Sequence, residues 1–152
     1  MKYQIRRARP EDAADISRVI IAALRQTNAA DYDTATIARV EQSFSEAGIA
    51  GLLEKRLIFV AADHDEVVAT ASLADDVVRS VFVAPEYQRS GLGEKLMLAV
   101  ENQALMRGSQ RLRVPSSITA QGFYKRLGYS KVRDEYHGDE RTIIMEKQLI
   151  KP

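Results

Sequence analysis

The segment QRSGLGEKL at residues 88–96 places two glycines where an apolar stretch gives way to a helical pattern. A helix that begins at Gly91 has unpaired N–H groups on its first turn and the positive end of its dipole there, which favours an anion. Glycine also lets a phosphate approach the backbone without a Cβ in the way. Gln88, Arg89 and Ser90 add donors and a positive charge beside it. The segment therefore predicts a phosphate site, the alternative being that Gly91 and Gly93 only shape a turn.

Two familiar phosphate motifs do not fit these glycines. A P-loop has Lys and then Ser or Thr after its second glycine, whereas Glu94 follows Gly93 here. A dinucleotide fingerprint has a third glycine three residues after the second, where this chain has Leu96. The predicted site therefore belongs to another class.

The wider segment VFVAPEYQRSGLGEKL resembles the acetyl-CoA binding motif of the GNAT acyltransferase family, Gln/Arg-x-x-Gly-x-Gly/Ala, with Gln88, Gly91 and Gly93 at its fixed positions. Downstream, SITAQGFYKRLGYSKV resembles the second signature of that family, a small polar residue followed by Ala, Phe-Tyr and Gly-Tyr. The resemblance spans nearly the whole chain. It implies the acyl-CoA N-acyltransferase fold and an acetyl-CoA-dependent N-acetyltransferase.

In that family the loop and the helix start hold the CoA pyrophosphate, and the preceding strand pairs with the pantetheine arm. The resemblance implies that this chain binds acetyl-CoA, as a co-substrate, through Phe82, Val83, Gln88, Arg89, Ser90, Gly91, Leu92, Gly93 and Ser117. Many members have Asn where Ser116 and Ser117 stand, and a serine can still bond the cofactor there.

Acetyl transfer from a thioester to an amine needs a neutral amine and a protonated leaving thiol. An alkyl ammonium has a pKa near ~10 and a thiol near ~8.5, so one group must take a proton and another must supply one. Tyr124, at the tyrosine position of the family, is the expected acid; its alternative role is a packed core aromatic. A backbone N–H of residues 81–83 is a candidate donor to the thioester carbonyl.

The general base stays open at this point. Five side chains and water are the candidates; the side chains are Asp75, Asp76, Glu135, His137 and Asp139. His64 is expected to be structural or exposed. The spacing of the two histidines and of the acidic turn at 63–66 matches no metal site, so no metal is expected.

The elements around these residues follow from apolar periodicity. Strands are expected at 3–8, 57–62, 67–74, 77–84, 111–115, 130–136 and 141–150, and helices at 10–28, within 31–49, at 91–108 and within 116–128. Gly48 is expected to stop the second helix. The order β-α-α-β-β-β-α-β-α-β-β predicts an α+β fold, a single mixed, mostly antiparallel sheet flanked by helices, and one domain over residues 1–152.

Composition limits the other classes of function. The chain has 152 residues, 22 Lys and Arg against 21 Asp and Glu, and no cysteine. A formal net charge of +1 offers no global field for nucleic acid or an anionic membrane. No stretch approaches the ~18 apolar residues of a membrane span, and no signal-peptide pattern is present, so a cytoplasmic protein without nucleic-acid or membrane partners is expected.

The acceptor is expected to be a primary amine of a small molecule or a peptide. The first two helices and the loop DEYHGDER should line its cleft, with Tyr32, Phe44 and Tyr136 as candidate aromatic walls. The strand at 141–150 is expected to extend a sheet or meet a partner, which favours a homodimer. The alternative function is a non-catalytic sensor of CoA or acyl-CoA with the same fold.

Overall fold

The computed structural model describes residues 3–26, 33–138 and 140–150. The strands are β1 (Tyr3–Arg7), β2 (Leu57–Asp63), β3 (Glu66–Ala74), β4 (Val77–Val83), β5 (Arg111–Ser116), β6 (Ser130–His137) and β7 (Glu140–Gln148). The helices are α1 (Ala13–Gln26), α2 (Thr34–Ser43), α3 (Glu46–Lys55), α4 (Leu92–Met106) and α5 (Gln121–Arg126), and short 3-10 turns cover Pro10–Asp12 and Pro85–Tyr87.

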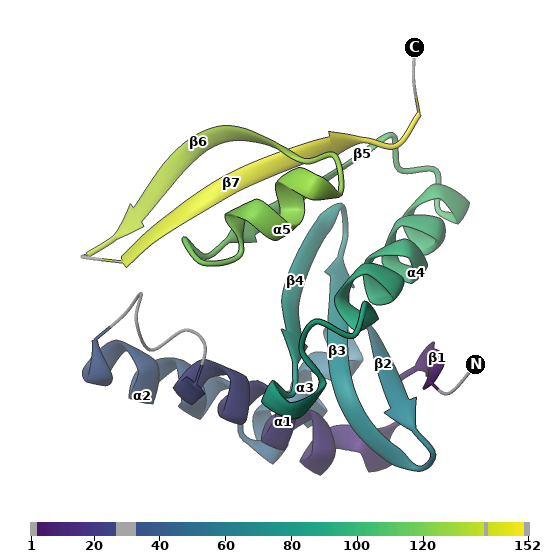
Figure 1. The fold of residues 1–152 in the computed structure, drawn as a ribbon, viewed down its shortest axis with the longest axis vertical. Coiled ribbons are helices and arrows are strands. Elements are labelled where there is room, and N and C mark those ends of the chain that lie inside the picture. Colours follow the sequence, from purple (N-terminus) through teal and green to yellow (C-terminus); the bar gives the residue numbers. More distant parts are fainter. Residues whose placement is uncertain (1–2, 27–32, 139, 151–152) are drawn as a thin grey trace.

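The strands form one seven-stranded sheet in the order β1-β2-β3-β4-β5-β7-β6. Every neighbouring pair is antiparallel except β4 and β5, which are parallel. Figure 1 shows how β4 leans away from β5 and from the β6–β7 hairpin. The mixed, mostly antiparallel sheet expected from the sequence is confirmed.

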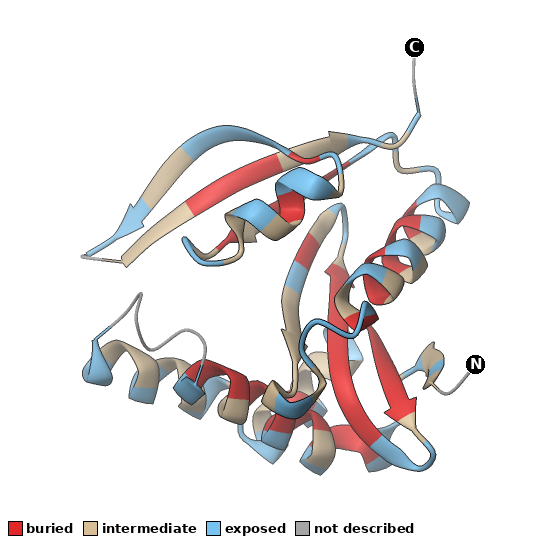
Figure 2. Ribbon diagram, in the orientation of Figure 1, coloured by how far each residue is buried: buried red, intermediate tan, exposed pale blue. Residues whose placement is uncertain are grey.

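Helices cover both faces of the β2–β3 region, so these strands are apolar throughout rather than alternating. Ile58 and Val60 pack into one core cluster with α1 and α3, whereas Phe59 and Ala61 pack into the other cluster with α4. Figure 2 shows β2 and β3 buried along nearly their whole length. The β5–β7–β6 half joins only the second cluster, and this leaves its other face less covered.

The helical segment between α1 and β2 differs from the expectation. Gly48 does not stop a helix but lies inside α3, whose N-cap Ser45 accepts a hydrogen bond from the Gly48 N–H at 3.1 Å. A Cβ at position 48 would collide with the carbonyl oxygen of Ser43. The glycine therefore permits the close approach of α2 and α3, and its spacing was mistaken for a C-terminal cap.

The last strand is not at an edge of the sheet, and its contact with a partner stays a prediction. β7 lies between β5 and β6 and is hydrogen-bonded to both, so it has no free edge with which to extend a sheet. The outer strands are β1 and β6. Within the described residues, no helix is long and apolar enough to cross a membrane.

Candidate active site

The parallel pair β4 and β5 opens the sheet. Their register holds a single residue pair within the described chain, Val77 with Arg113, supported by a 3.0 Å hydrogen bond from the Arg113 N–H to the Asp76 carbonyl. A bulge in β4 opposite Ala71 bends the strand beyond this point, and Ser80 there has a φ of 57°. The two strands therefore separate toward Val83.

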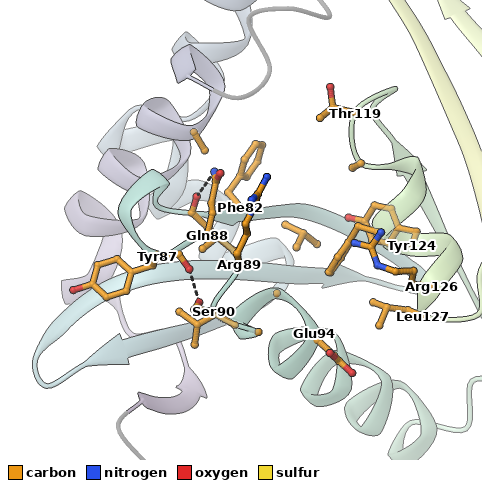
Figure 3. Close-up of a pocket in the computed structure, with 18 of the residues that line it drawn as sticks. Phe82, Tyr87, Gln88, Arg89, Ser90, Glu94, Thr119, Tyr124, Arg126 and Leu127 are labelled. Carbon is orange, nitrogen blue, oxygen red and sulfur yellow. Dashed lines mark hydrogen bonds between the residues drawn. The ribbon is translucent and has the colours of Figure 1, made fainter.

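A cavity of about 680 Å³ lies where the strands separate. Its lining comes from the end of β4, the loop that follows, the start of α4, and α5 (Figure 3). The lining residues include all the residues expected to bind acetyl-CoA, Phe82, Val83, Gln88, Arg89, Ser90, Gly91, Leu92, Gly93 and Ser117, together with Tyr124.

The glycine-containing loop is held by its own hydrogen bonds. Ser90 Oγ donates to the Tyr87 carbonyl, and Gln88 Nε2 donates to the Val83 carbonyl at 3.4 Å (Figure 3). The Tyr87 hydroxyl donates to Asp63 Oδ2 at 2.9 Å, which raises the pKa of Tyr87 to about 12. The loop is thus tied to the end of β2 before α4 begins.

Gly91 and Gly93 have different structural roles. Gly91 is the N-cap of α4 with a φ of 82°, a left-handed conformation that glycine adopts without cost, and a Cβ there would meet no atom within 4 Å. A Cβ on Gly93 would lie 3.1 Å from Cζ of Phe123, so this glycine lets α5 pack against the first turn of α4. The first backbone hydrogen bond of α4 runs from the Lys95 N–H to the Gly91 carbonyl at 3.1 Å. The N–H groups of residues 92–94 therefore have no acceptor within the helix.

The backbone of β4 alternates between β3 and the cavity. The Ala84 N–H bonds the Val68 carbonyl at 2.8 Å, so Ala84 and Phe82 are hydrogen-bonded positions toward β3. Val83, between them, must then direct its N–H and carbonyl away from β3, toward the opening. Phe82 instead packs its ring edge-on to Phe44, with centroids 6.2 Å apart.

Tyr124 enters the cavity from α5. The residue is 5% exposed, and burial raises the pKa of its hydroxyl well above the ordinary value of tyrosine. Within the described ranges, the Tyr124 hydroxyl has no hydrogen-bond partner. Every fully buried side-chain oxygen in those ranges does have a partner, so the Tyr124 oxygen is not fully buried. The hydroxyl therefore reaches the cavity itself, protonated and available.

A buried polar group stands behind Tyr124. The Tyr129 ring packs edge-on to the Tyr124 ring at 5.8 Å, and its hydroxyl donates to Glu101 Oε2 at 2.9 Å. Lys147 Nζ bonds the same carboxylate at 3.1 Å and lies 5.7 Å from the Tyr129 ring centre. Burial and the Glu101 charge raise the pKa of Tyr129. The Tyr124 ring therefore packs against a Tyr129 ring that is held in place by its hydrogen bond to Glu101.

The family model described as "Acetyltransferase (GNAT) domain" matches residues 22–149. The chain belongs to the GNAT acetyltransferase family. It is 28% identical to the uncharacterized N-acetyltransferase YafP of Escherichia coli (strain K12) over 132 residues, which covers 87% of this chain and 84% of that protein.

Solved structures agree with this membership. A GCN5-related N-acetyltransferase from Rhodopseudomonas palustris superposes with a TM-score of 0.89 at 27% identity, covering 97% of this chain and 96% of that one. PaiA N-acetyltransferase from Thermoplasma acidophilum, solved with coenzyme A, gives a TM-score of 0.85 at 19% identity over 97% and 99% of the two chains. The family and the acyl-CoA N-acyltransferase fold expected from the sequence are confirmed.

A second cavity of about 790 Å³ adjoins the first in this GNAT domain. It is lined by α2, by β4 and by the less covered face of β5, β7 and β6, and it shares Val81, Phe82, Ser117, Ala120 and Tyr124 with the first cavity. Ser116 lines only the second, and Ser117 Oγ accepts the Ala120 N–H at 3.2 Å. Tyr124 therefore stands where two cavities meet.

The candidate general bases differ in whether they line a cavity. Glu135 and His137 line the second cavity, and Arg133 bonds the Glu135 carboxylate at 2.6 Å. Asp75 and Asp76 lie in the turn between β3 and β4 and line neither cavity; the Asp76 carboxylate accepts from Ser109 Oγ at 2.6 Å. Asp139 lies outside the described residues.

The expected aromatic walls are only partly present. Phe44 lines the second cavity, whereas Tyr136 is 66% exposed on β6 and does not line it. Tyr32 lies outside the described residues. His64 is exposed in the turn between β2 and β3, as expected, and its ring Nδ1 lies 3.0 Å from Asp63 Oδ1.

Several lining residues of this GNAT site were not singled out in the sequence. In the first cavity they are Thr119 and Arg126, which lie within the second signature, and in the second they are Arg79, Arg113 and Arg133. Arg39 and Glu140 also line the second cavity, and both lie in segments that were expected to line the acceptor cleft. A signal for two of the arginines was present, because Arg79 and Arg113 interrupt apolar strands. The described residues hold no group of three or more His, Cys, Asp and Glu side chains suited to a metal, and the absence of a metal stays a prediction.

Proposed function

We propose that this GNAT domain transfers an acetyl group from acetyl-CoA to a primary amine of a small molecule or peptide, by direct attack of the amine on the thioester. The observation that carries the proposal is the position of Tyr124, whose hydroxyl lies where a cavity ending at a helix N-terminus meets a second cavity. PaiA was solved with coenzyme A, and yncA of Salmonella typhimurium, at 22% identity and a TM-score of 0.70 over 100% of this chain and 96% of that one, with acetyl-CoA. Both support the same ligand here.

The phosphates of acetyl-CoA would sit at the first turn of α4. The N–H groups of residues 92–94 point out of the helix end there, and the left-handed Gly91 leaves the space in front of them open. Arg89 of the loop and Arg126 of α5 line the same cavity as this helix end, and the Arg89 side chain extends toward Phe82 (Figure 3). Two guanidinium groups and a helix dipole suit a pyrophosphate.

The pantetheine arm would run along the open edge of β4. Val83 offers an N–H and a carbonyl on that edge, as an amide-containing chain requires, and Ser117 offers a hydroxyl across from it. This alignment brings the thioester toward Tyr124, at the border with the second cavity.

The chain's residues would then move two protons. Tyr124 donates its hydroxyl proton to the departing CoA sulfur, and burial keeps that proton in place at neutral pH by raising the tyrosine pKa. The proton lost by the attacking amine passes to Glu135, to His137 or to water in the second cavity, and from there restores Tyr124. The amine gains the acetyl group and CoA leaves as a thiol.

The proposal is tested by the release of free thiol from acetyl-CoA over a panel of amines, amino acids and peptides. We expect release that depends on one class of amine, with an N-acetylated product of matching amount. Binding of CoA without transfer to any amine would instead identify a sensor. Assembly as a homodimer stays a prediction, and a mass near 17.0 kDa by light scattering would contradict it.

A further inference from the structure

Arginines dominate the charge of the second cavity. Among the described lining residues, the positive side chains come from four different elements, Arg39 of α2, Arg79 of β4, Arg113 of β5 and Arg133 of β6. The acidic lining residues are Glu135 and Glu140, at the far end of the β6–β7 hairpin. The overall charge of the chain, +1, does not predict this local surplus.

Two of the arginines are already neutralised. Arg133 pairs with Glu135 at 2.6 Å, and Arg113 Nε pairs with Glu146 Oε2 at 2.9 Å. Arg39 and Arg79, by contrast, have no carboxylate within 4.0 Å in the described part of the chain. The charge of Arg39 still helps to lower the pKa of the Asp33 carboxylate, so Arg79 is the less neutralised of the two guanidinium groups that could bind a ligand.

A third arginine adds to the positive field beside Arg79. Arg56 donates to Ser80 Oγ at 3.2 Å and, across the described residues, also lacks a carboxylate within 4.0 Å. Burial, and then the positive charge of Arg79, lower the pKa of Arg56. Two like charges thus lie close together without a counter-ion, an arrangement that an anion would stabilise.

Arg79 lies on the face of β4 that lines the second cavity. Val78 packs into the core under α4, so the neighbouring Arg79 side chain points to the opposite face, where it is exposed and lines the second cavity. The same cavity reaches Tyr124. A molecule that places its amine at Tyr124 therefore extends toward Arg79.

From this arrangement, and resting on the acetyl transfer proposed above, we infer that the acceptor is a small amine that also carries an anionic group, a carboxylate or a phosphate, bound by Arg79 and Arg39. Guanidinium groups match both anions because each presents parallel N–H donors to two oxygens. Polyamines, aminoglycosides and Lys-rich peptides are poor acceptors on this account, since their extra cations meet unpaired arginines.

The test compares acceptors that differ only in the anion. Initial rates of thiol release are measured with L-amino acids against their carboxamides, with phosphoethanolamine against ethanolamine, and with spermidine. We expect kcat/KM to be at least ~10-fold higher for the anionic member of one pair, with spermidine below both members, because one bound charge contributes about that factor. The amino acid pairs and the phosphate pair separate the two kinds of anion.

Variants identify the arginine. Arg79→Gln should remove the preference by raising KM for the anionic acceptor, with kcat and CoA affinity little changed, and Arg79→Lys should retain part of it. Arg39→Gln should weaken it as well. Arg107→Gln, an exposed arginine at the C-cap of α4 outside both cavities, is the matched control and should keep the full preference.

Each outcome decides between the inference and the function it rests on. Equal or faster transfer to neutral or cationic amines overturns the inference and leaves the acetyltransferase intact. If CoA binds but no amine is acetylated, the proposed function fails. Calorimetry of the CoA-saturated protein with N-acetyl amino acids and their amides then decides the anion site, because Arg79-dependent binding of the acids supports it and its absence overturns it.

Discussion

Val77 of β4 is paired in parallel with Arg113 of β5, and beyond this pair the two strands separate. Within the described residues, β4 pairs with no strand on that side beyond Val77, and the Val83 carbonyl, where the following loop leads into α4, accepts a hydrogen bond from Gln88 Nε2. A sheet with this opening can accept an extended, amide-containing ligand as if it were another strand. The start of α4 and Tyr124 both line the cavity at that opening.

The helix end should decide CoA affinity. Gly91→Val should weaken CoA binding by about tenfold or more, because the side chain would project into the open space in front of the α4 N-terminus. Gly108→Val is the matched control, since Gly108 follows the other end of α4 with a similar φ of 86° and equally open surroundings. Calorimetry with CoA measures both, and equal losses would mean that backbone strain, not the phosphate site, is responsible.

Arg89, in the loop before α4, should contribute less to CoA affinity than the helix end. Arg89→Ala should weaken CoA binding by about fivefold to tenfold, the range for one exposed, charge-assisted contact to phosphate. The loss should shrink as salt is added, because the contact is screened. An Arg89→Ala variant that binds CoA like the wild type at low salt would place the phosphates elsewhere.

Tyr124→Phe isolates the acid. The variant keeps the ring against Phe123 and Tyr129 but removes the hydroxyl proton, so kcat should fall by ~100-fold to ~10,000-fold while acetyl-CoA affinity barely changes. Since burial raises the Tyr124 pKa, the wild-type rate should show no loss from tyrosine ionisation up to about pH 10. A kcat within about threefold of wild type, with chemistry rate-limiting, would return Tyr124 to a packing role.

Two glycines of α3 should respond in opposite directions to alanine. Gly48→Ala should destabilise the fold, because its Cβ would collide with the Ser43 carbonyl oxygen. Gly51→Ala should stabilise it by about 0.5–1 kcal/mol, since a Cβ there meets nothing within 4 Å and alanine favours a helix interior. Urea unfolding measures both, and a Gly48→Ala variant as stable as wild type would contradict the close approach of α2 and α3.

The ionised Asp12 carboxylate should make the free energy of unfolding fall at low pH. Its carboxylate accepts from Arg6 at 2.8 Å and from the Arg9 N–H at 2.7 Å, and the Arg6 hydrogen bond holds the pKa of Asp12 below its usual range. A lowered folded-state pKa gives stability that is present above the unfolded value of ~3.9 and is lost as pH falls through the folded pKa.

Asp12→Asn should therefore cost about 1–3 kcal/mol near neutral pH, and the difference from wild type should shrink as the pH falls below the unfolded value of ~3.9. Asp15→Asn is the control, because its ion pair with Arg18, 3.4 Å long, is largely exposed and should contribute less than about 0.5 kcal/mol. A deficit of Asp12→Asn that stays constant down to pH 2 would show that packing, not charge, is lost.

The parts of the site that the sequence predicted are those encoded locally. The loop from Gln88 to Gly93 and the Phe-Tyr pair at Tyr124 are continuous segments, and their residue types report the conformation directly. The place of β7 between β5 and β6 could not be read, because strand order depends on distant pairings. The arginine lining was missed for the same reason, since Arg39, Arg79 and Arg113 meet only after the sheet has formed. Gly48 misled because a glycine at a close approach looks the same as one at a helix end.

The most direct test of the acetyl-CoA site is the hydrogen exchange of the Val83 backbone amide, measured by NMR with and without CoA. Strand alternation directs the N–H of this residue into the opening between β4 and β5, whereas the N–H of Phe82 faces β3. We predict that saturating CoA slows exchange at Val83 by at least ~10-fold more than at Phe82, because the pantetheine arm supplies the missing acceptor. Unchanged exchange at Val83 in protein that calorimetry shows to be saturated with CoA would contradict the account.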